Sequence, residues 1–403
     1  MQSNLDEFIQ NSNNVLLLQG PVGHFFRHFG QFLQQKHQKQ VFKINFNGGD
    51  RHFYPESAQN EQVVSYTGTV DDFDAFLADF VHRHQIDNIV CFGDTRIYHR
   101  KAKALCKASH PEIGFWVFEE GYFRPHYITF EKDGVNDYSP EPRDSAALLA
   151  AYPLLGEPVP PYPVAPGFWP MAWLASKYYW FLYRNKEIYT HYHHHRSDNV
   201  YWYARSWLVG GWIKLCSVFN ERKIIRQIET GSLNQFFIVP LQVHMDSQIK
   251  VHSDFKSVAS FLRSVIRSFA IDAPAQTKLI IKHHPMDRGF IDYSNLLKKL
   301  IKHYNLEVRV IYVFNIPLPI LMRKAQGMIV VNSTSGLSAM VHRLPVKVMG
   351  KSNYDMLRMT DQQPLFSFWH HPSPSVPAVF NAFRLYHLHK TQINGSFYGR
   401  FYF

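Results

Sequence analysis

Short apolar runs alternate with longer amphipathic stretches in two separate parts of this chain. A buried strand needs only a short apolar run, and a helix that covers a sheet needs only one apolar stripe. This alternation therefore predicts parallel strands that are connected by helices. In the first part, strands are predicted at Val15–Leu18, Val41–Phe46, Ile89–Phe92 and Phe115–Phe118, and helices at His24–Gln38, Asp71–Gln85 and Arg96–Ser109.

The same rhythm resumes in the second part of the chain. We therefore predict an α/β protein with two Rossmann-like domains that face each other across a cleft. In open sheets of this kind, ligands collect at the carboxyl ends of the strands, so functional residues are sought there. The predicted strands are Phe236–Pro240, Lys278–Lys282, Glu307–Tyr312, Met328–Val331 and Val346–Met349, and the helices are Phe255–Ser268, Tyr293–His303 and Leu318–Ala325.

A proline-rich stretch separates the two parts, since seven prolines between residues 153 and 170 exclude regular structure there. We predict an N-terminal domain over 1–150 and a C-terminal nucleotide-sugar-binding domain over 231–375. Residues 151–230 form a linker and a helical, aromatic and histidine-rich segment. Residues 376–403 form a tail that packs back on the N-terminal domain.

The composition indicates a protein that attracts anions. Lys and Arg outnumber Asp and Glu by 43 to 32, and aromatic residues make up 16% of the chain. Three cysteines cannot build a disulfide framework, so a reducing compartment is predicted. The N-terminus has no signal-peptide pattern and no run is long enough to span a membrane. The basic, aromatic segment 168–214 is predicted to lie on a membrane surface.

Two adjacent acids, Glu119 and Glu120, end the fourth predicted strand and precede Gly121. Successive strand residues point to opposite faces, so one of the two is expected at the ligand-binding edge. A carboxylate there can act as a base or as a nucleophile at an electrophilic carbon; a solvated acidic turn is the alternative. Arg124 can hold an anionic substrate group or pair with a glutamate.

Two polar clusters close strands in the second part. Imidazoles can donate to a phosphate, and hydroxyls with free N–H groups at the start of a helix form an anion site. A polar loop and ordinary helix capping are the respective alternatives, but the occurrence of both clusters in one domain favours phosphate binding. The residues are Lys282, His284 and Pro285 after one strand, and Ser333, Thr334 and Ser335 after another.

The turn Gln19-Gly20-Pro21-Val22-Gly23 lacks both the dinucleotide-binding glycine pattern and the lysine of a P-loop. It predicts either a simple tight turn or a backbone that a sugar approaches closely at Gln19, Gly20 and Gly23. The cluster His191–His195 has consecutive histidines, which rarely reach tetrahedral positions. No metal site is therefore predicted, and a pH-sensitive or lipid-facing basic patch is favoured.

Five phrases between residues 16 and 336 resemble those of bacterial transferases that use CMP-activated acidic sugars. More closely, they resemble the capsular-polysaccharide synthesis proteins of Gram-negative bacteria of the KpsS/LipB type, a family of retaining β-Kdo transferases. Relatives that extend the Kdo linker carry Glu-Asp-Gly where Glu119-Glu120-Gly121 stands here. The phrases are LLLQGPVGHFFRHFGQFL, FEEGYFRPHYITFEKDGVN, FIVPLQVHMDSQI, KHHPMDRG and NSTSG.

The resemblance implies a GT-B architecture and transfer of Kdo from CMP-β-Kdo, with retention, onto lysophosphatidylglycerol. This step starts the poly-Kdo linker of a capsular polysaccharide at the inner face of the inner membrane. Glu120 would be the nucleophile with Glu119 in support, or a base in a single displacement. Arg124 would hold the Kdo carboxylate, and Gln242 and Asp246 the ribose or cytosine.

In this scheme, Lys282, His284 and the hydroxyls of Ser333–Ser335 balance the phosphate charge of CMP, so no metal or other cofactor is expected. The expected partners are CMP-Kdo, the lipid acceptor, the anionic inner-membrane surface and other capsule synthesis and export proteins, and no nucleic acid. Two alternatives share the motifs: an inverting CMP-sialic acid transferase, and a non-enzymatic capsule export or scaffold protein.

Overall fold

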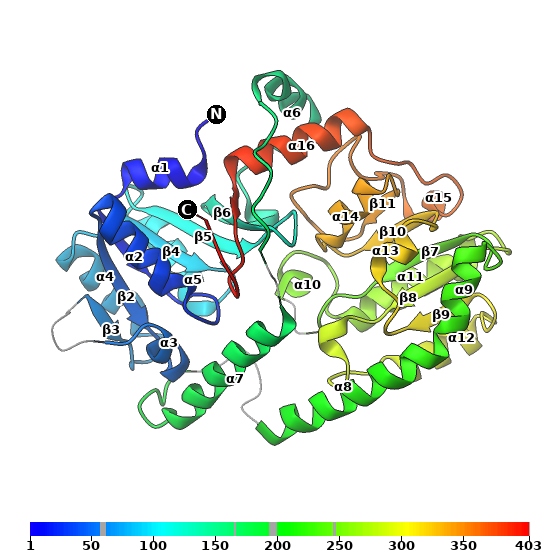
Figure 1. The fold of residues 1–403 in the computed structure, drawn as a ribbon, viewed down its shortest axis with the longest axis horizontal. Coiled ribbons are helices and arrows are strands. Elements are labelled where there is room, and N and C mark those ends of the chain that lie inside the picture. Colours follow the sequence, from blue (N-terminus) through cyan, green and yellow to red (C-terminus); the bar gives the residue numbers. More distant parts are fainter. Residues whose placement is uncertain (57–61, 165–166, 193–199, 245–246, 403) are drawn as a thin grey trace. The chain divides into compact units, whose positions relative to one another are not determined.

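The structure is a computed structural model that describes residues 1–56, 62–164, 167–192, 200–244 and 247–402. It divides into two compact units, each with its own sheet and apolar core (Figure 1). The predicted α/β class with two Rossmann-like units is confirmed. Unit 1 comprises Met1–Glu141, Ala151–His195 and Arg384–Phe403, and unit 2 comprises Pro142–Ala150 and Arg196–Phe383.

Unit 1 is built on a seven-stranded sheet of order β12-β6-β5-β4-β1-β2-β3. Strands β1 to β5 run parallel; β1, β2, β4 and β5 were predicted from the apolar runs, whereas the parallel β3 and the antiparallel β6 and β12 are additions that the sequence did not predict. The strands are β1 (Asn14–Leu17), β2 (Gln40–Asn45), β3 (Val63–Ser65), β4 (Asn88–Phe92), β5 (Gly114–Glu120), β6 (Tyr127–Lys132) and β12 (Gln392–Asn394).

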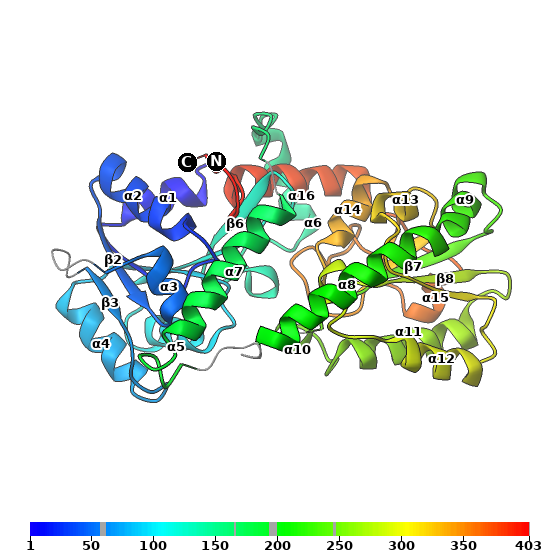
Figure 2. The ribbon, with the colours of Figure 1, turned by 60° about the horizontal axis from the view of Figure 1, so that its bottom comes forward.

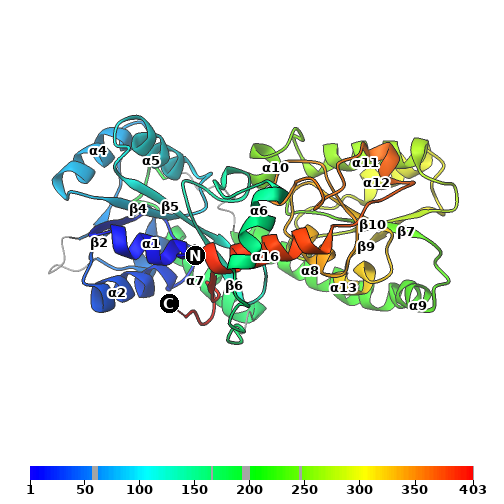
Figure 3. The same ribbon diagram turned by 90° about the horizontal axis from the view of Figure 1, so that it is seen from above.

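Helices cover both faces of this sheet, with α1 and α2 on one side and α4 and α5 on the other (Figure 3). Because both faces are buried, the strands are apolar on both sides rather than alternating. After β2, Asn47 is the N-cap of a short helix, and its side chain accepts from the Asp50 N–H. The helices are α1 (Asn4–Asn11), α2 (Phe25–His37), α3 (Gly48–Phe53), α4 (Phe73–Arg83) and α5 (Ile97–Ala108).

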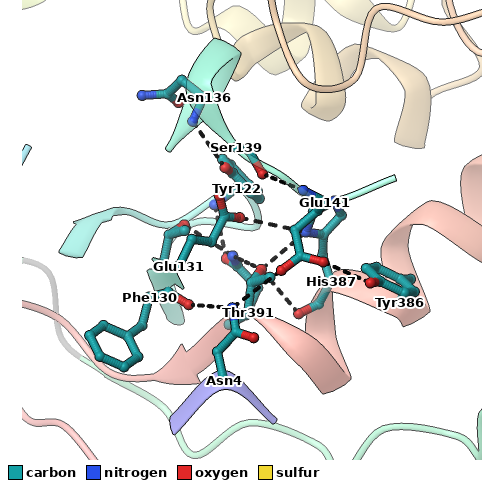
Figure 4. A network of polar contacts seen from close by, with 12 residues as sticks. Asn4, Tyr122, Phe130, Glu131, Asn136, Ser139, Glu141, Tyr386, His387 and Thr391 are labelled. Atoms are coloured by element: carbon teal, nitrogen blue, oxygen red, sulfur yellow. Dashed lines mark hydrogen bonds and ion pairs between the residues drawn. The ribbon is translucent and has the colours of Figure 1, made fainter. Parts of the chain in front are cut away.

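The C-terminal segment returns to unit 1 through a buried polar network (Figure 4). The Tyr386 hydroxyl donates to Glu141 at 2.7 Å, and Asn4 donates to the Phe130 carbonyl at 3.1 Å. At its centre, His387 Nδ1 lies 3.9 Å from Glu131 Oε1. Burial raises the pKa of Glu131 to about 8 and lowers the pKa of His387 to about 3. At neutral pH this pair is a protonated acid beside a neutral imidazole.

Unit 2 contains a parallel sheet of order β11-β10-β7-β8-β9, covered by α11 and α12 on one face and by α9 and α13 on the other (Figure 3). Its strands are β7 (Phe236–Pro240), β8 (Lys278–Lys282), β9 (Val310–Val313), β10 (Gly327–Val330) and β11 (Val346–Val348). Its helices are α8 (Val200–Asn220), α9 (Arg222–Thr230), α10 (Ser247–Val251), α11 (Val258–Asp272), α12 (Ser294–His303), α13 (Leu318–Met322), α14 (Ser335–Val341) and α15 (Leu365–Phe368).

The aromatic segment of the sequence forms two long helices, α7 (Phe168–Arg184) in unit 1 and α8 in unit 2 (Figure 2). Within the described residues, no helix combines the length and the apolar character that crossing a membrane requires. Two further helices, α6 (Ser145–Ala151) and α16 (Pro377–Lys390), each contain residues of both units.

Candidate functional site

The unit 2 sheet has a topological switch point between β7 and β10. The chain runs outward from β7 through β8 to β9 and then returns to β10 on the other side of β7. Loops that leave the carboxyl ends on either side of such a point diverge and form the usual ligand site of an open sheet. Gln242 and Asn332 join the two loops, since Gln242 Nε2 donates to Asn332 Oδ1 at 2.9 Å and the Asn332 N–H donates to Gln242 Oε1 at 3.3 Å.

The hydroxyl-rich turn Ser333–Ser335 follows β10 at this switch point. The N–H and hydroxyl of Ser335 donate to Ser333 Oγ at 3.2 and 2.9 Å, so the two side chains lie together. The Tyr354 hydroxyl donates to the Ser333 carbonyl, and a Cβ at Gly336 would lie 2.7 Å from that hydroxyl oxygen. Glycine is therefore needed at position 336 so that the Tyr354 hydroxyl can reach the turn. Thr334 takes the N-cap position of α14.

The end of β8 contributes a buried cation and an oriented imidazole. Lys282 is only 8% exposed, and burial together with the Arg288 charge lowers its pKa to about 8 against the opposing effect of Glu221. His284 Nδ1 accepts from the Met286 N–H at 3.2 Å, so in the neutral imidazole the proton is on Nε2, which can donate to an anion. Pro285 begins the 3-10 turn that presents this histidine.

A carboxylate–imidazole pair that we did not predict links the loops after β7 and β8. Asp287 is buried and accepts from the N–H of His244 at 2.7 Å, and its other oxygen lies 2.8 Å from His244 Nδ1. The carboxylate fixes the ring orientation, while about a quarter of the His244 side chain stays exposed. The sequence offered two signals for this pair: an acid stands three residues after His284, and a histidine stands two residues after Gln242.

Unit 1 has an equivalent switch point between β1 and β4, because the chain leaves β1 toward β3 and returns at β4. The two strand ends are joined directly: the Phe92 N–H donates to the Gln19 carbonyl at 3.1 Å, and Arg96 Nη1 lies 3.5 Å from the Gly20 carbonyl. Glu119 ends the next strand along, beside Gly93, where a Cβ would lie 3.7 Å from Glu119 Oε2.

The two glutamates of β5 belong to opposite layers of unit 1. Phe115 and Val117 pack in the core that contains α4 and α5, whereas Phe118 packs in the core that contains α1 and α2. Strand alternation therefore assigns Glu119 to the first face and Glu120 to the second. The sequence alone left this assignment open.

Glu119 holds its proton unusually well. Burial raises the pKa of Glu119 to about 7, and the negative charges of Glu120 and Asp94 raise this pKa further. The Glu120 N–H donates to Glu119 Oε1 at 2.9 Å, and this hydrogen bond lowers the pKa. The positive charge of Arg124 lowers the same pKa, so this guanidinium acts on the acidic turn. Its Nε donates to the Gly121 carbonyl at 3.3 Å. A carboxyl with a pKa near 7 suits proton exchange at neutral pH.

The Gln19 side chain lies in a buried cluster around Asp50. Its Nε2 donates to the Asp50 carboxylate at 3.2 Å and to the Tyr178 hydroxyl at 3.1 Å. A Cβ at Gly20 would lie 2.8 Å from the Phe26 ring, and Gly23 has a φ of +117° beside Leu174 of α7. Packing within unit 1 thus accounts for the glycine at both positions.

The predicted residues that the structure describes divide between the two units. Asp246 and three histidines of the His191–His195 cluster lie outside the described residues. In the part of the chain that the structure describes, no group of three or more His, Cys, Asp or Glu side chains is placed to hold a metal ion. In unit 1 the residues Gln19, Gly20, Glu119, Glu120 and Arg124 lie at or after the carboxyl ends of strands, but the Gln19 side chain belongs to the separate Asp50 cluster. In unit 2 the carboxyl ends of the strands and the turns after them carry Gln242, Lys282, His284, Pro285, Ser333, Thr334 and Ser335.

A family model described as capsule polysaccharide biosynthesis protein matches residues 87–398. The chain belongs to this family. It is 47% identical to the capsule polysaccharide modification protein LipB of Neisseria meningitidis serogroup B, over 100% of this chain and 96% of that protein. It is 37% identical to the capsule polysaccharide export protein KpsS of Escherichia coli, over 99% of this chain and 100% of that protein. The predicted resemblance to the KpsS/LipB type is confirmed.

Among solved structures, the capsule protein is similar to Thermosulfurimonas dismutans KpsC, a beta Kdo 2,7 transferase. The identity is 12% and the TM-score 0.42, over 91% of this chain and 88% of that one. Similarity at this level transfers no activity.

Proposed function

We propose that this capsule protein is a glycosyltransferase that moves Kdo from CMP-β-Kdo, with retention, onto a lysophosphatidylglycerol acceptor at the inner face of the inner membrane. The proposal is supported most by the chemistry of unit 2, where Lys282, His284 and the Ser333–Ser335 turn line one sheet edge beside the switch point. These groups suit the phosphate of a nucleotide sugar, and the capsule family supplies the context of a surface polysaccharide.

The first chemical step joins the sugar to the protein. A Glu120 oxygen forms a bond to the anomeric carbon of Kdo while the bond from that carbon to the CMP phosphate oxygen breaks, and the electron pair leaves with CMP. Lys282, the His284 Nε2–H and the serine hydroxyls stabilise the departing phosphate. No metal is assigned to this step. Arg124 balances the Kdo carboxylate.

In the second step, the acceptor hydroxyl oxygen bonds to the anomeric carbon and the ester bond to Glu120 breaks. Glu120 recovers its electron pair, and the proton that the hydroxyl releases passes through water to Glu119, which lies on the other face of the sheet. Two inversions give net retention. With a pKa of about 7, Glu119 can accept this proton and return it to solvent.

The decisive experiment incubates the purified protein with CMP-Kdo and a short-chain lysophosphatidylglycerol. The expected product carries one β-linked Kdo, identified by mass and by anomeric configuration. Transfer from CMP-sialic acid with inversion would instead identify the other transferase class. Absence of both transfer and donor hydrolysis would favour a non-enzymatic role in capsule export.

A further inference from the structure

One face of α7 is fixed to the body of unit 1 by close packing. The Tyr178 hydroxyl donates to Asp50 Oδ1 at 3.2 Å, and the Phe181 ring stacks on His52 with centroids 3.7 Å apart. A Cβ at Gly48 would lie 2.3 Å from the Phe181 carbonyl oxygen, so α3 approaches this helix as closely as glycine allows. The rotation of α7 about its axis is therefore determined within unit 1.

The opposite face of α7 presents three tryptophans to solvent. Trp169, Trp173 and Trp180 are 79%, 64% and 62% exposed. At 100° per residue they lie within about 40° of one another and about 140–180° from Tyr178. Lys177 lies 5.0 Å from the centre of the Trp173 ring. A monomeric soluble protein rarely exposes such a large aromatic stripe without a partner.

Helix α8 in unit 2 repeats this arrangement independently. Its buried side carries Ser206 and Ser217, and a Cβ at Gly210 would lie 2.6 Å from the Arg288 carbonyl oxygen. The other side presents an exposed stripe that spans about 60° of the helix. The stripe consists of Leu208, Trp212, Leu215 and Phe219.

The charges beside both stripes identify the partner. Residues 168–186 contain Lys177, Arg184 and Lys186 but no Asp or Glu, and α8 contains Arg205 and Lys214 but no Asp or Glu. A second copy of the chain would bring like charges together, which disfavours self-association through these faces. Tryptophan beside Lys and Arg is instead the composition that settles at the surface of an anionic bilayer.

We propose that the α7 stripe (Trp169, Trp173, Trp180) and the α8 stripe are two membrane-docking surfaces, one in each unit, that insert into the headgroup layer of an anionic bilayer. The inference deepens the proposed function, on which it rests for the lipid nature of the acceptor. It replaces a general membrane affinity of segment 168–214 with two defined helix faces. Docking would supply a lipid acceptor to the enzyme from the layer in which the stripes lie.

The test measures co-sedimentation of the full-length protein with phosphatidylcholine vesicles that contain or lack 30% phosphatidylglycerol. We expect binding to the anionic vesicles to be at least about tenfold tighter. Replacing Trp169, Trp173 and Trp180 together by serine should weaken it at least about tenfold. The matched control is Phe366→Ser, because Phe366 is 55% exposed in α15, away from both stripes.

A charge variant keeps the test decisive if the triple variant does not fold. Lys177→Glu with Arg184→Glu preserves the buried face of α7 and should weaken anionic binding about 30-fold or more. Equal binding to both vesicle types, or unchanged binding by a folded stripe or charge variant, would overturn the proposal. The proposal would also be overturned if the wild-type protein were a dimer and the stripe variant became a monomer while its vesicle binding stayed unchanged.

Transfer to a water-soluble short-chain acceptor, measured without vesicles, separates this inference from the proposed function. The stripe variants should retain that transfer. Vesicle binding without any transfer would reject the proposed transferase function and support the docking surfaces. Transfer without vesicle binding would support the transferase function and reject the docking surfaces.

Discussion

The two sheets of this protein place opposite chemistry at equivalent positions. At the carboxyl ends of the unit 1 strands, β5 ends in two glutamates, and burial raises the pKa of Glu119 to about 7. At the carboxyl ends of the unit 2 strands, β8 ends in Lys282, and burial lowers the pKa of this lysine to about 8. In both units the low-polarity surroundings move the group toward its neutral form.

Under the proposed function, the same topology supports two different roles in one reaction. A carboxyl edge can attack carbon and exchange protons, whereas an edge of Lys, His and hydroxyls can stabilise a departing phosphate. The contrast comes from the last residues of the strands and the turns that follow them, because the central residues of β5 and β8 are apolar in both units. Variants at the two edges should therefore fail in different ways.

The largest effect is expected for Glu120→Gln, which removes the proposed nucleophile of the carboxyl edge but keeps the shape of the side chain. We expect kcat for Kdo transfer to fall by about 10³-fold or more, with CMP affinity unchanged. Steady-state kinetics with CMP-Kdo, together with calorimetric titration of CMP, measure both quantities. Near-normal turnover would exclude Glu120 as the nucleophile.

Glu119→Gln tests the role of Glu119 at the same edge, because this variant should change how the transfer rate depends on pH. If Glu119 must be ionised to take the acceptor proton, the wild-type rate rises with pH through its pKa of about 7. The variant should be slower and should lose this rise. A rise that persists in the variant would assign the titration to another group.

At the edge that carries Lys282 and His284, His284→Ala and Lys282→Met should weaken CMP binding by about 10–100-fold each, because each removes a proposed charge-assisted contact to phosphate. Lys278→Met is the matched control, since Lys278 begins the same strand at its other end. Titration calorimetry with CMP measures the affinities. Equal losses for Lys278 and Lys282 would show a general charge effect rather than a site.

A smaller effect is expected for Asp287→Asn, which loosens the orientation of His244 while keeping the size of the side chain. We expect the donor KM to rise about three- to tenfold, as for one ordinary hydrogen bond, with kcat nearly unchanged. Asp292→Asn is the control, because Asp292 is exposed in the following loop. A change in kcat alone would argue against an effect on donor binding.

The smallest effect concerns stability, away from both edges. Because the folded pKa of Glu131 is raised to about 8, the folded state holds a proton that the unfolded state releases above about pH 4.3. Stability from this group is therefore lost as pH rises from about 4.3 to about 8. Glu131→Gln should be about 2–4 °C more stable than wild type at pH 9, with a flatter pH dependence. Thermal melts at pH 5, 7 and 9 test this, with Glu157→Gln as an exposed control.

Much of the candidate site could be located from strand ends alone. Acids at the end of β5, a His-Pro turn after β8 and hydroxyls after β10 are local signals, because a strand end and its turn are continuous in sequence. The His244–Asp287 pair joins two different loops, and neither residue signals the other. The engagement of Gln19 by Asp50 and Tyr178 was hidden for the same reason, since Tyr178 comes from a helix far along the chain.

The local pattern of apolar residues determined the parallel core of each unit, because burial on both faces demands continuous apolar strands. Only the tertiary structure decided that β6 and β12 extend the first sheet antiparallel, since β12 is a three-residue edge strand and the direction of β6 depends on the strands it pairs with. It also decided which glutamate belongs to which layer and which face of α7 is exposed. Those outcomes depend on what packs against a residue, and packing partners distant in sequence leave no mark in the residues beside it.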